Sequence, residues 1–274
     1  MSDESELTSG ARVESGQAYG LFTDTTLCIG CKACEVACKQ WNGLPADSFD
    51  FLGTSYDNTL SLGAHTWRHV KFVEQPAPPG GELRWLFLSD ICKHCEHAGC
   101  LDACPTGAIV RSEFGTVVIQ QDICNGCKYC VPACPYGVIT TDDVGDGKAH
   151  KCTLCYDRLK GGLEPACAKA CPTDSIQFGP IEDLRTRARA RVEGLREQGF
   201  PEARLYGGEP DGLGATNGIH QLNSFFLLMD HPNVYGLPEA PALPARNIVP
   251  GALASAAAAV LLVGATVAAL LRRT

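Results

Sequence analysis

The 274-residue sequence has no excess of basic side chains, and this shortage excludes one class of protein. Lysine and arginine number 23 against 31 aspartates and glutamates, so the formal net charge at pH 7 is −8. A chain this acidic is a poor candidate for binding nucleic acid, which requires a basic face. The hydrophobic fraction of 45% is ordinary, which excludes an intrinsically disordered chain.

The beginning of the sequence lacks the features of a secretory signal. Residues 1–18 are polar, with no apolar core and no pair of adjacent arginines. We therefore expect a solvated polar tail over residues 1–18.

Cysteine, in contrast, is present in large excess. Sixteen cysteines in 274 residues far exceed normal usage, and the chain is too long for a small disulfide scaffold. Glycine (29) and proline (17) are also plentiful. Such a composition predicts many loops that are organised by something other than a hydrophobic core. It therefore favours a protein that binds metal.

The cysteines fall into four groups of four, with none left over. The first and third groups have the spacing C-x2-C-x2-C-x3-C of bacterial ferredoxins, and three of the groups end in Cys-Pro. The second group has C-x2-C-x4-C-x3-C, and the fourth has C-x2-C-x11-C-x3-C. The groups are Cys28, Cys31, Cys34, Cys38; Cys92, Cys95, Cys100, Cys104; Cys124, Cys127, Cys130, Cys134; and Cys152, Cys155, Cys167, Cys171.

This spacing predicts [4Fe–4S] clusters, because each iron of the cube needs one thiolate. Three closely spaced cysteines wrap one cube, and the fourth faces away and ligates a second cube. Motifs must therefore come in pairs, and four motifs predict four clusters. We also expect the fourth cysteine to start a helix, since the following proline suits a helix start.

Two other uses of the cysteines remain open at this point. The even number permits eight disulfides, although three cysteines crowded into one turn suit metal ligation better. The group Cys152, Cys155, Cys167 and Cys171, taken alone, also resembles a zinc ribbon site.

Apolar runs around turn residues predict three hairpins and one long helix. The helix begins after Pro180, has acidic residues in its first turn, and should pack one apolar stripe on the body. The predicted strand pairs are 67–73 with 83–89, 109–111 with 116–119, and 138–140 with 148–151, and the predicted helix is 181–199.

Residues 248–271 form the one long uncharged run. A helix of this length spans roughly 36 Å, enough to cross a hydrocarbon core of about 30 Å. A buried alanine-rich helix is the alternative. Because Gly251 and Ser255 are four residues apart, we expect the helix to pack on helices of a partner. Arg272 and Arg273 follow the run, so the positive-inside bias predicts a cytoplasmic C-terminus and an extracytoplasmic body.

Several stretches resemble a known family. Residues 23–34 (TDTTLCIGCKAC) resemble the opening of the four-cluster ferredoxin subunits of molybdenum and tungsten oxidoreductases. Other stretches, together with the terminal apolar helix, resemble the beta subunit of membrane-bound respiratory formate dehydrogenase. They are Trp41-Asn42, Tyr56-Asp57-Asn58, Trp67, Cys152-Thr153-Leu154-Cys155, Glu164-Pro165-Ala166-Cys167 and Gly236-Leu237-Pro238.

The resemblance implies an α+β fold of two bacterial-ferredoxin-like dicluster units with inserted hairpins, plus one C-terminal transmembrane helix. The expected segments are a polar tail (1–18), the first motif with an inserted hairpin (19–90), an inner unit of motifs two and three (91–145), the fourth motif (146–180), a helix and extended approach (181–245) and a transmembrane anchor (246–274).

The resemblance also implies how the cysteines share four [4Fe–4S] clusters, with the outer motifs paired and the inner motifs paired. Lys39 stands where the other motifs have proline, so we expect a local difference in helix start there. The implied ligand sets are Cys28, Cys31, Cys34 and Cys171; Cys38, Cys152, Cys155 and Cys167; Cys92, Cys95, Cys100 and Cys134; and Cys104, Cys124, Cys127 and Cys130.

The implied function is electron transfer. We identify no acid–base pair, nucleophile or substrate pocket, and expect His94 and His97 to lie beside the clusters or on the surface. The resemblance implies a molybdenum or tungsten catalytic alpha subunit that oxidises formate, and a membrane cytochrome b gamma subunit that passes electrons to quinone. Alternatives are the equivalent subunit of a hydrogenase or a sulfur-compound or sulfoxide reductase, or a free-standing membrane-anchored ferredoxin.

Overall fold

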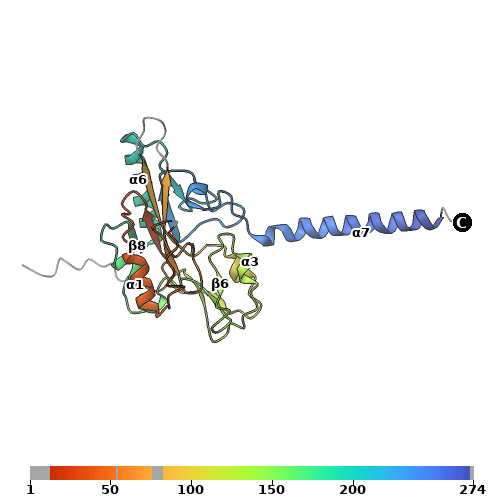
Figure 1. The fold of residues 1–274 in the computed structure, drawn as a ribbon. Coiled ribbons are helices and arrows are strands. Elements are labelled where there is room, and N and C mark those ends of the chain that lie inside the picture. The colour runs from red at the N-terminus through yellow and green to blue at the C-terminus, as the bar shows by residue number, and fades with distance from the viewer. Residues whose placement is uncertain (1–12, 54, 76–82, 272–274) are drawn as a thin grey trace, which may run out of the picture.

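The computed structural model describes residues 13–53, 55–75 and 83–271. Most of the body consists of short elements joined by loops, and one long helix extends from it (Figure 1). The elements are β1 (Tyr19–Asp24), α1 (Ala33–Asn42), β2 (Arg68–Gln75), β3 (Arg84–Ile91), α2 (Gly99–Asp102), β4 (Ile109–Arg111), β5 (Val117–Ile119), α3 (Cys130–Ala133), β6 (Thr140–Thr141), β7 (Ala149–His150), α4 (Tyr156–Lys160), α5 (Ala166–Lys169), β8 (Ile176–Pro180), α6 (Ile181–Glu197), β9 (Arg204–Tyr206), β10 (Ser224–Leu228), η2 (Pro232–Tyr235), η3 (Pro244–Asn247) and α7 (Ile248–Leu271).

A four-stranded sheet in the order β8-β1-β10-β9 forms the apolar centre of the body. Strand β1 runs parallel to β10 and antiparallel to β8. Every residue of β1 and β10 is buried, because layers cover both faces of these strands. Helix α6 packs on β1, β8 and β9, and its buried residues recur three or four positions apart, as predicted for one apolar stripe.

The three predicted strand pairs are present as antiparallel pairs. Strand β2 pairs with β3, β4 with β5, and β6 with β7. Most of the turn expected between β2 and β3, residues 76–82, lies outside the described residues. That the pair β2–β3 is an insertion into a ferredoxin-like unit stays a prediction, as do the segment boundaries given above.

The expectation that the fourth cysteine of each motif starts a helix is wrong. Cysteines Cys100, Cys130 and Cys167 lie at the first or second position of α2, α3 and α5, and these helices end just before the Cys-Pro pairs. The third and fourth cysteines are four residues apart, so one helical turn separates them. Proline cannot continue a helix, which ends α2, α3 and α5 after four residues each.

The same reason explains why the first motif differs. Helix α1 contains Cys34 and Cys38 and continues to Asn42, because Lys39 replaces the proline. The difference is therefore at the end of the helix and not at its start. The Lys39 ammonium also ties the following loop, donating to the carbonyl oxygens of Pro45 and His65.

The short motif helices pack in two pairs, α1 on α5 and α2 on α3. Gly99 allows the second pair to approach closely. A Cβ atom at Gly99 would lie 2.7 Å from the carbonyl oxygen of Ala133 in α3 and 3.2 Å from the Leu243 side chain. Helix α2 therefore also contacts the segment that leads to α7.

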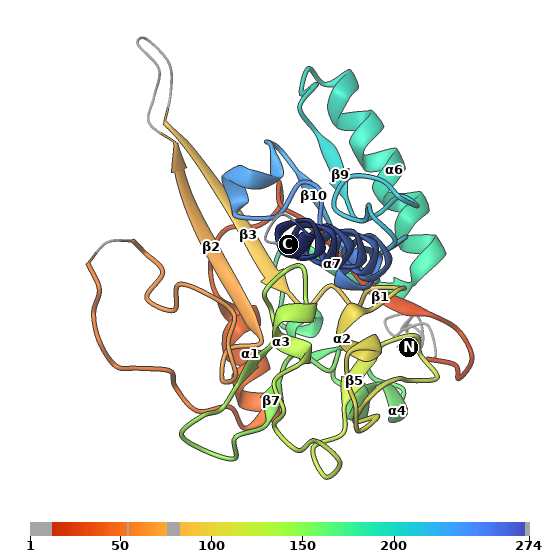
Figure 2. The ribbon, with the colours of Figure 1, turned by 90° about the vertical axis from the view of Figure 1, so that its right-hand side faces the viewer.

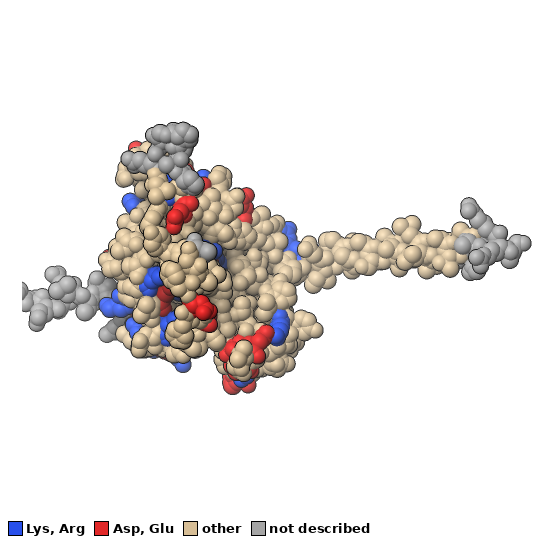
Figure 3. Space-filling view, in the orientation of Figure 1, with Lys and Arg blue, Asp and Glu red and all other residues tan. Residues whose placement is uncertain are grey.

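Helix α7 projects away from the body and touches little of it (Figures 1 and 2). The segment Pro244–Thr266 has a mean hydropathy of 2.1 and is long and apolar enough to cross a membrane. Figure 3 shows no charged side chain along α7, in contrast to the mixed charges on the body. Arg272 and Arg273, used above to predict sidedness, lie outside the described residues, as do residues 1–12 of the expected polar tail.

Candidate iron–sulfur centres

All sixteen cysteines are free thiols. Disulfides, one of the alternatives for the cysteine pattern, are therefore not part of this structure. Most of these thiols are buried or half-buried, and only Cys31 and Cys127 are exposed. The residues expected as ligands can thus be located group by group.

The first expected set meets around one small cavity, which is lined by Cys28, Cys31, Cys34 and Cys171. Three of these cysteines precede or open α1, and Cys171 follows α5, more than 130 residues later in the chain. Burial raises the pKa of the Cys28 thiol, and the nearby Cys171 and Cys31 thiolates raise it further.

The second expected set lies deeper. Burial raises the pKa of Cys38, and the thiolates of Cys167 and Cys155 act in the same direction. Burial also raises the pKa of Cys155 to about 11, with Cys167 contributing. Cys152 has Cys38, Cys155 and Cys167 among its charged neighbours. These four thiols come from α1, the turn before α4, and α5.

The third expected set is also brought together. Burial raises the pKa of Cys100 to about 12, and Cys92 and Cys134 are among the neighbouring thiolates that raise it. Burial raises the pKa of Cys95 as well, and its neighbours are again Cys92, Cys134 and Cys100.

The fourth expected set lines a second small cavity, with Cys104, Cys124, Cys127 and Cys130 around it. Burial raises the pKa of Cys130 to about 11, and the other three thiolates raise it further.

The donor chemistry fits iron–sulfur clusters. Thiols with raised pKa values stay protonated at neutral pH, so a metal that binds them must displace their protons. Cys104 is an exception: burial raises its pKa, but hydrogen bonds from Thr106 and from backbone N–H groups outweigh this effect and lower it. The cysteines would supply thiolate ligands to a cluster bound in such a cavity, and the cluster would supply one-electron redox chemistry.

The backbone conformation inside each motif also directs N–H groups toward the cysteine sulfurs. Gly30, His94, Gly126 and Leu154 precede the second cysteine of their motifs, and all four have positive φ angles, 66°, 45°, 73° and 56°. The Leu154 N–H donates to Cys152 Sγ at 3.2 Å. Successive N–H groups in such a turn form a concavity that favours negative charge. Two of the four positions hold side chains at a conformational cost of roughly 1–2 kcal/mol each, which marks a functional constraint.

Adjacent expected sets influence each other electrostatically through their thiols. Besides burial, the Cys167 thiolate of the second set raises the pKa of Cys34 in the first set. In the same way Cys92 of the third set acts on Cys152, and Cys130 of the fourth set acts on Cys100. These interactions link the expected sets in the order first, second, third and fourth.

The two histidines of the second motif have different places. His94 is buried, and its Nδ1 accepts a hydrogen bond from the Val117 N–H at 3.1 Å. Burial lowers the pKa of His94 well below its usual value, so the ring is neutral. His97 is exposed, and its ring lies 6.1 Å from that of His220.

Sequence reasoning missed the buried charged residues around the sulfurs. Arg68, Lys93 and Lys151 are each at most 2% exposed. Burial raises the pKa of Cys100, whereas the Lys151 ammonium lowers it. Burial likewise raises the pKa of Cys134, and the Lys93 ammonium lowers it. No sequence motif indicates these three residues. Arg68 lies in β2, and Lys93 and Lys151 are each adjacent to a cysteine in the sequence, so their burial depends on the tertiary fold.

A buried polar cluster also lies beside the first motif. Glu35, Asp57 and His69 bring their ligand atoms within 4.8 Å of one another. The Lys32 ammonium lies 2.8 Å from Asp57 Oδ1 and 3.6 Å from Glu35 Oε2. Lysine therefore provides the positive charge that the carboxylates require, and the cluster braces the loop after α1 against β2.

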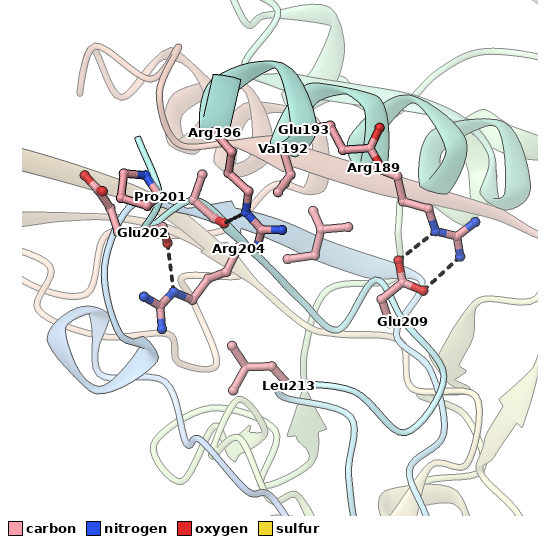
Figure 4. Close-up of a pocket in the computed structure, with 11 residues that line it drawn as sticks. Arg189, Val192, Glu193, Arg196, Pro201, Glu202, Arg204, Glu209 and Leu213 are labelled. Atoms are coloured by element: carbon pink, nitrogen blue, oxygen red, sulfur yellow. Dashed lines mark hydrogen bonds and ion pairs between the residues drawn. The ribbon is translucent and has the colours of Figure 1, made fainter. Parts of the chain in front are cut away.

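A hollow of about 520 Å³ lies between α6 and β9, away from the cysteines (Figure 4). Arg189 donates to both carboxylate oxygens of Glu209, at 2.7 and 2.9 Å, and Arg196 donates to the carbonyl oxygen of Ala203. No cysteine lines this hollow. Its paired charges fasten α6 to the residues after β9.

The paired motifs and converging thiols define a dicluster ferredoxin-type electron-transfer protein. Two models of 4Fe-4S dicluster domains match the chain, one over residues 27–108 and one over residues 83–181. The matches overlap and together include all four cysteine groups, and they support four [4Fe–4S] clusters.

Comparison with known proteins narrows the family. The iron-sulfur subunit of formate dehydrogenase-O from Escherichia coli (strain K12) is 42% identical over 80% of this chain and 70% of that protein. The iron-sulfur subunit of the nitrate-inducible formate dehydrogenase from the same strain is 40% identical over 86% of this chain and 78% of that protein. The chain therefore belongs to the family of formate dehydrogenase iron–sulfur subunits.

A wider relationship is also present. The B subunit of anaerobic dimethyl sulfoxide reductase from Escherichia coli (strain K12) is 37% identical over 62% of this chain and 77% of that protein. The chain is thus an iron–sulfur electron-transfer subunit of formate dehydrogenase or dimethyl sulfoxide reductase type. It is not catalytic alone, and it implies a catalytic partner.

Proposed function

We propose that the chain passes electrons from a molybdenum or tungsten formate dehydrogenase catalytic subunit to a membrane haem b subunit and quinone. In this proposal each of the four cysteine sets holds one [4Fe–4S] cluster. The ligand sets are Cys28, Cys31, Cys34 and Cys171; Cys38, Cys152, Cys155 and Cys167; Cys92, Cys95, Cys100 and Cys134; and Cys104, Cys124, Cys127 and Cys130.

The observation that carries this proposal is the linked order of the four sets. A thiol of each set acts electrostatically on a thiol of the following set, which supports a continuous path for electrons. The two exposed cysteines, Cys31 and Cys127, belong to the first and last sets. A path that is buried in the middle and open at both ends suits transfer between two partners.

The position of α7 supports a direction for the path. Helix α3, which begins at Cys130, lies on the side of the body from which α7 emerges, and α1 lies on the opposite side (Figure 1). Leu243, just before α7, approaches Gly99 in α2. The fourth set would therefore face the membrane partner, and the first set would face the catalytic partner.

The overall reaction balances as two half-reactions. Formate yields carbon dioxide, one proton and two electrons in the catalytic partner, and quinone takes up two electrons and two protons at the membrane. The four clusters held by the sixteen cysteines would carry the electrons one at a time, with no proton or atom transferred. The body would lie on the extracytoplasmic side of the membrane.

The substrate can be tested on the purified complex. Formate added without oxygen should bleach the visible absorbance of the oxidised clusters, and a membrane quinone analogue should restore it. Bleaching by hydrogen gas, with no response to formate, would replace formate dehydrogenase by hydrogenase as the partner.

The similarity to the B subunit of dimethyl sulfoxide reductase favours one second candidate, a reductase complex in which electrons flow in the opposite direction. In that case a quinol would bleach the clusters, and a sulfoxide would restore their absorbance. A free-standing ferredoxin would purify with no large partner subunit, and identification of the co-purifying proteins separates it from both.

A further inference from the structure

Arg68, at the start of β2, is a buried cation with part of its hydrogen-bonding capacity unused. The residue is 1% exposed. Its Nη1 donates to the carbonyl oxygen of Ser89 at 3.2 Å and to Ser89 Oγ at 2.8 Å. The Nε and Nη2 atoms have no hydrogen-bond partner among the described residues, and no carboxylate in that part of the chain pairs with the guanidinium.

Such an arrangement is costly unless something else accepts the free N–H groups. A charge removed from water needs a partner of opposite charge, and an unsatisfied buried donor is itself destabilising. The charged groups around Arg68 are sulfurs. Burial alone would lower the pKa of Arg68, but the thiolates of Cys167, Cys34, Cys152 and Cys38 raise it above its ordinary value.

These four cysteines belong to two different ligand sets. Cys34 is in the first proposed set, and Cys38, Cys152 and Cys167 are in the second. Helix α1, which carries Cys34 of the first set and Cys38 of the second, packs on β2, where Arg68 lies. Arg68 therefore lies between the first two sets, and the Cys34 and Cys167 thiols of these sets also act on each other electrostatically.

Ser89 extends the reach of Arg68 toward the first set. Its Oγ lies 3.2 Å from Cys34 Sγ. Because Arg68 Nη1 must donate to this oxygen, the single hydroxyl hydrogen of Ser89 is free to point at Cys34. When Cys34 is a thiolate ligand it can only accept, so the direction of the relay from Arg68 through Ser89 to Cys34 is fixed.

The other buried cations differ in this respect. The Lys93 ammonium has Asp90 and the Ile91 carbonyl oxygen as acceptors. The Lys151 ammonium has the carbonyl oxygens of Val117 and Cys152. Each of these two cations is provided with protein oxygens, whereas Arg68 keeps two nitrogen atoms that face no protein oxygen.

We propose that Arg68 is a positioning residue that sets the reduction potentials of the first and second clusters. Its free Nε–H and Nη2–H groups, which have no hydrogen-bond partner among the described residues, would be available to donate to sulfur atoms of the second cluster, and its Nη1–H would act on the first cluster through Ser89. The inference rests on the proposed ligand sets. Each electron that arrives adds one negative charge, and a fixed positive charge with N–H donors favours the reduced form. Arg68 keeps its proton throughout.

The test is a redox titration of the assembled membrane complex, followed by electron paramagnetic resonance. R68Q should lower the equilibrium constant for reduction of the first and second clusters at least tenfold, which is about 59 mV for one electron. The third and fourth clusters should keep their potentials. R68K, which keeps the charge but not the planar fork, should give a smaller shift in the same direction.

S89A provides a second and milder variant. It should lower the potential of the first cluster and leave the other three unchanged, because Arg68 still reaches the second set. The matched control is R185Q, since Arg185 is a buried arginine of α6 whose ion-pair partner is Glu182. All four potentials should remain at wild-type values in this control.

Several outcomes overturn the proposal. Unchanged potentials in R68Q, or equal shifts in all four clusters, would show that Arg68 does not act between the first two sets. If R68Q fails to retain iron, the potentials of S89A and R68K test the proposal instead. Wild-type potentials in both of these variants would contradict the proposed role of Arg68. Iron content and formate bleaching of the wild-type complex are measured in the same preparation, so a failure of the proposed function is recognised separately.

Discussion

Burial and mutual repulsion act on the cysteine thiols in the same direction. Both raise the pKa, as for Cys34 and Cys130, where burial is the larger cause and the pKa is about 11. The apo protein would therefore hold Cys34, Cys130 and the other thiols with raised pKa values protonated, and iron would have to displace these protons. Ligand removal should accordingly affect one cluster at a time.

Cys171 gives the sharpest test of this sharing. Cys171→Ala removes one thiolate from the first proposed set, so it should damage the cluster held mainly by Cys28, Cys31 and Cys34, about 140 residues earlier in the chain. The electron paramagnetic resonance signal of one cluster should disappear or convert to a three-iron signal, while three clusters remain.

Thr173→Ala is the matched control, because Thr173 lines the same cavity without offering a thiolate. It should retain all four signals. Loss in Cys171→Ala of a cluster that is held only by the fourth motif would contradict the proposed sharing.

The cysteine positions could be predicted from sequence because ligand spacing is a local property. The polar groups around them could not. Arg68 and Ser89 face each other because β2 and β3 pair antiparallel, with Val70 opposite Ser89. This register depends on tertiary packing, and nothing local distinguishes Arg68 from an exposed arginine in a strand.

The short helices place neighbouring clusters on either side of one helical turn. In α1, Cys34 and Cys38 are four residues apart and lie on one face, yet they belong to different proposed sets. The same spacing separates Cys100 from Cys104 and Cys130 from Cys134. With the proposed ligand sets, a rigid turn between two ligands would fix the separation of neighbouring clusters, so helix packing would influence electron transfer.

Among the packing contacts of the short motif helices, the contact between α2 and α3 leaves the least room for a larger side chain. Gly99→Ala would place a Cβ atom 2.7 Å from the Ala133 carbonyl oxygen, and overpacking of this kind costs typically 1–3 kcal/mol. The third and fourth clusters should be lost first, which lowers the iron content by up to half. Iron analysis and resonance spectra of the purified complex measure this loss.

Gly194→Ala serves as the control, because a Cβ atom at Gly194 in α6 meets nothing within 4 Å. It should leave iron content unchanged. Full retention of iron in Gly99→Ala would mean that α2 and α3 can separate without loss of the inner clusters.

The local elements were easier to predict than the central sheet. The three antiparallel strand pairs and α6 follow from turn residues and apolar periodicity. The parallel pairing of β1 with β10 joins segments about 200 residues apart, with Leu21 opposite Ser224. No local sequence pattern predicts this pairing. The general preference of proline for the first turn of a helix predicts that a helix starts at each Cys-Pro pair. In the structure the helical turn is already formed before each pair, and the proline ends it.

At the scale of the whole body, the four cysteine groups predict the metal content. Four [4Fe–4S] clusters predict about sixteen iron atoms per chain. Iron and sulfide analysis of freshly isolated complex provides the measurement, after subtraction of the iron in the partner subunits. A value near twelve, or a three-iron signal in protein kept free of oxygen, would show that one motif is used differently.

The last prediction concerns the side of the membrane on which the body lies. Arg272 and Arg273 follow α7 with no acidic residue nearby, whereas Arg246 precedes it with Glu239 not far before. The positive-inside bias then keeps the C-terminus in the cytoplasm. An unfolded body would expose sixteen thiols to an oxidising compartment, where disulfides would form before iron is bound. Because clusters order their own loops, the body should acquire iron in the cytoplasm and cross the membrane folded.

Protease added to intact spheroplasts should therefore digest the body and leave the membrane segment with its cytoplasmic end. Arg272→Glu combined with Arg273→Glu removes the charge bias and should reduce the fraction of molecules that are digested from outside. Arg187→Glu, an exposed change in α6, controls for the loss of positive charge elsewhere. A body protected in intact spheroplasts and digested only after lysis would place it in the cytoplasm, and the charge argument would then be wrong.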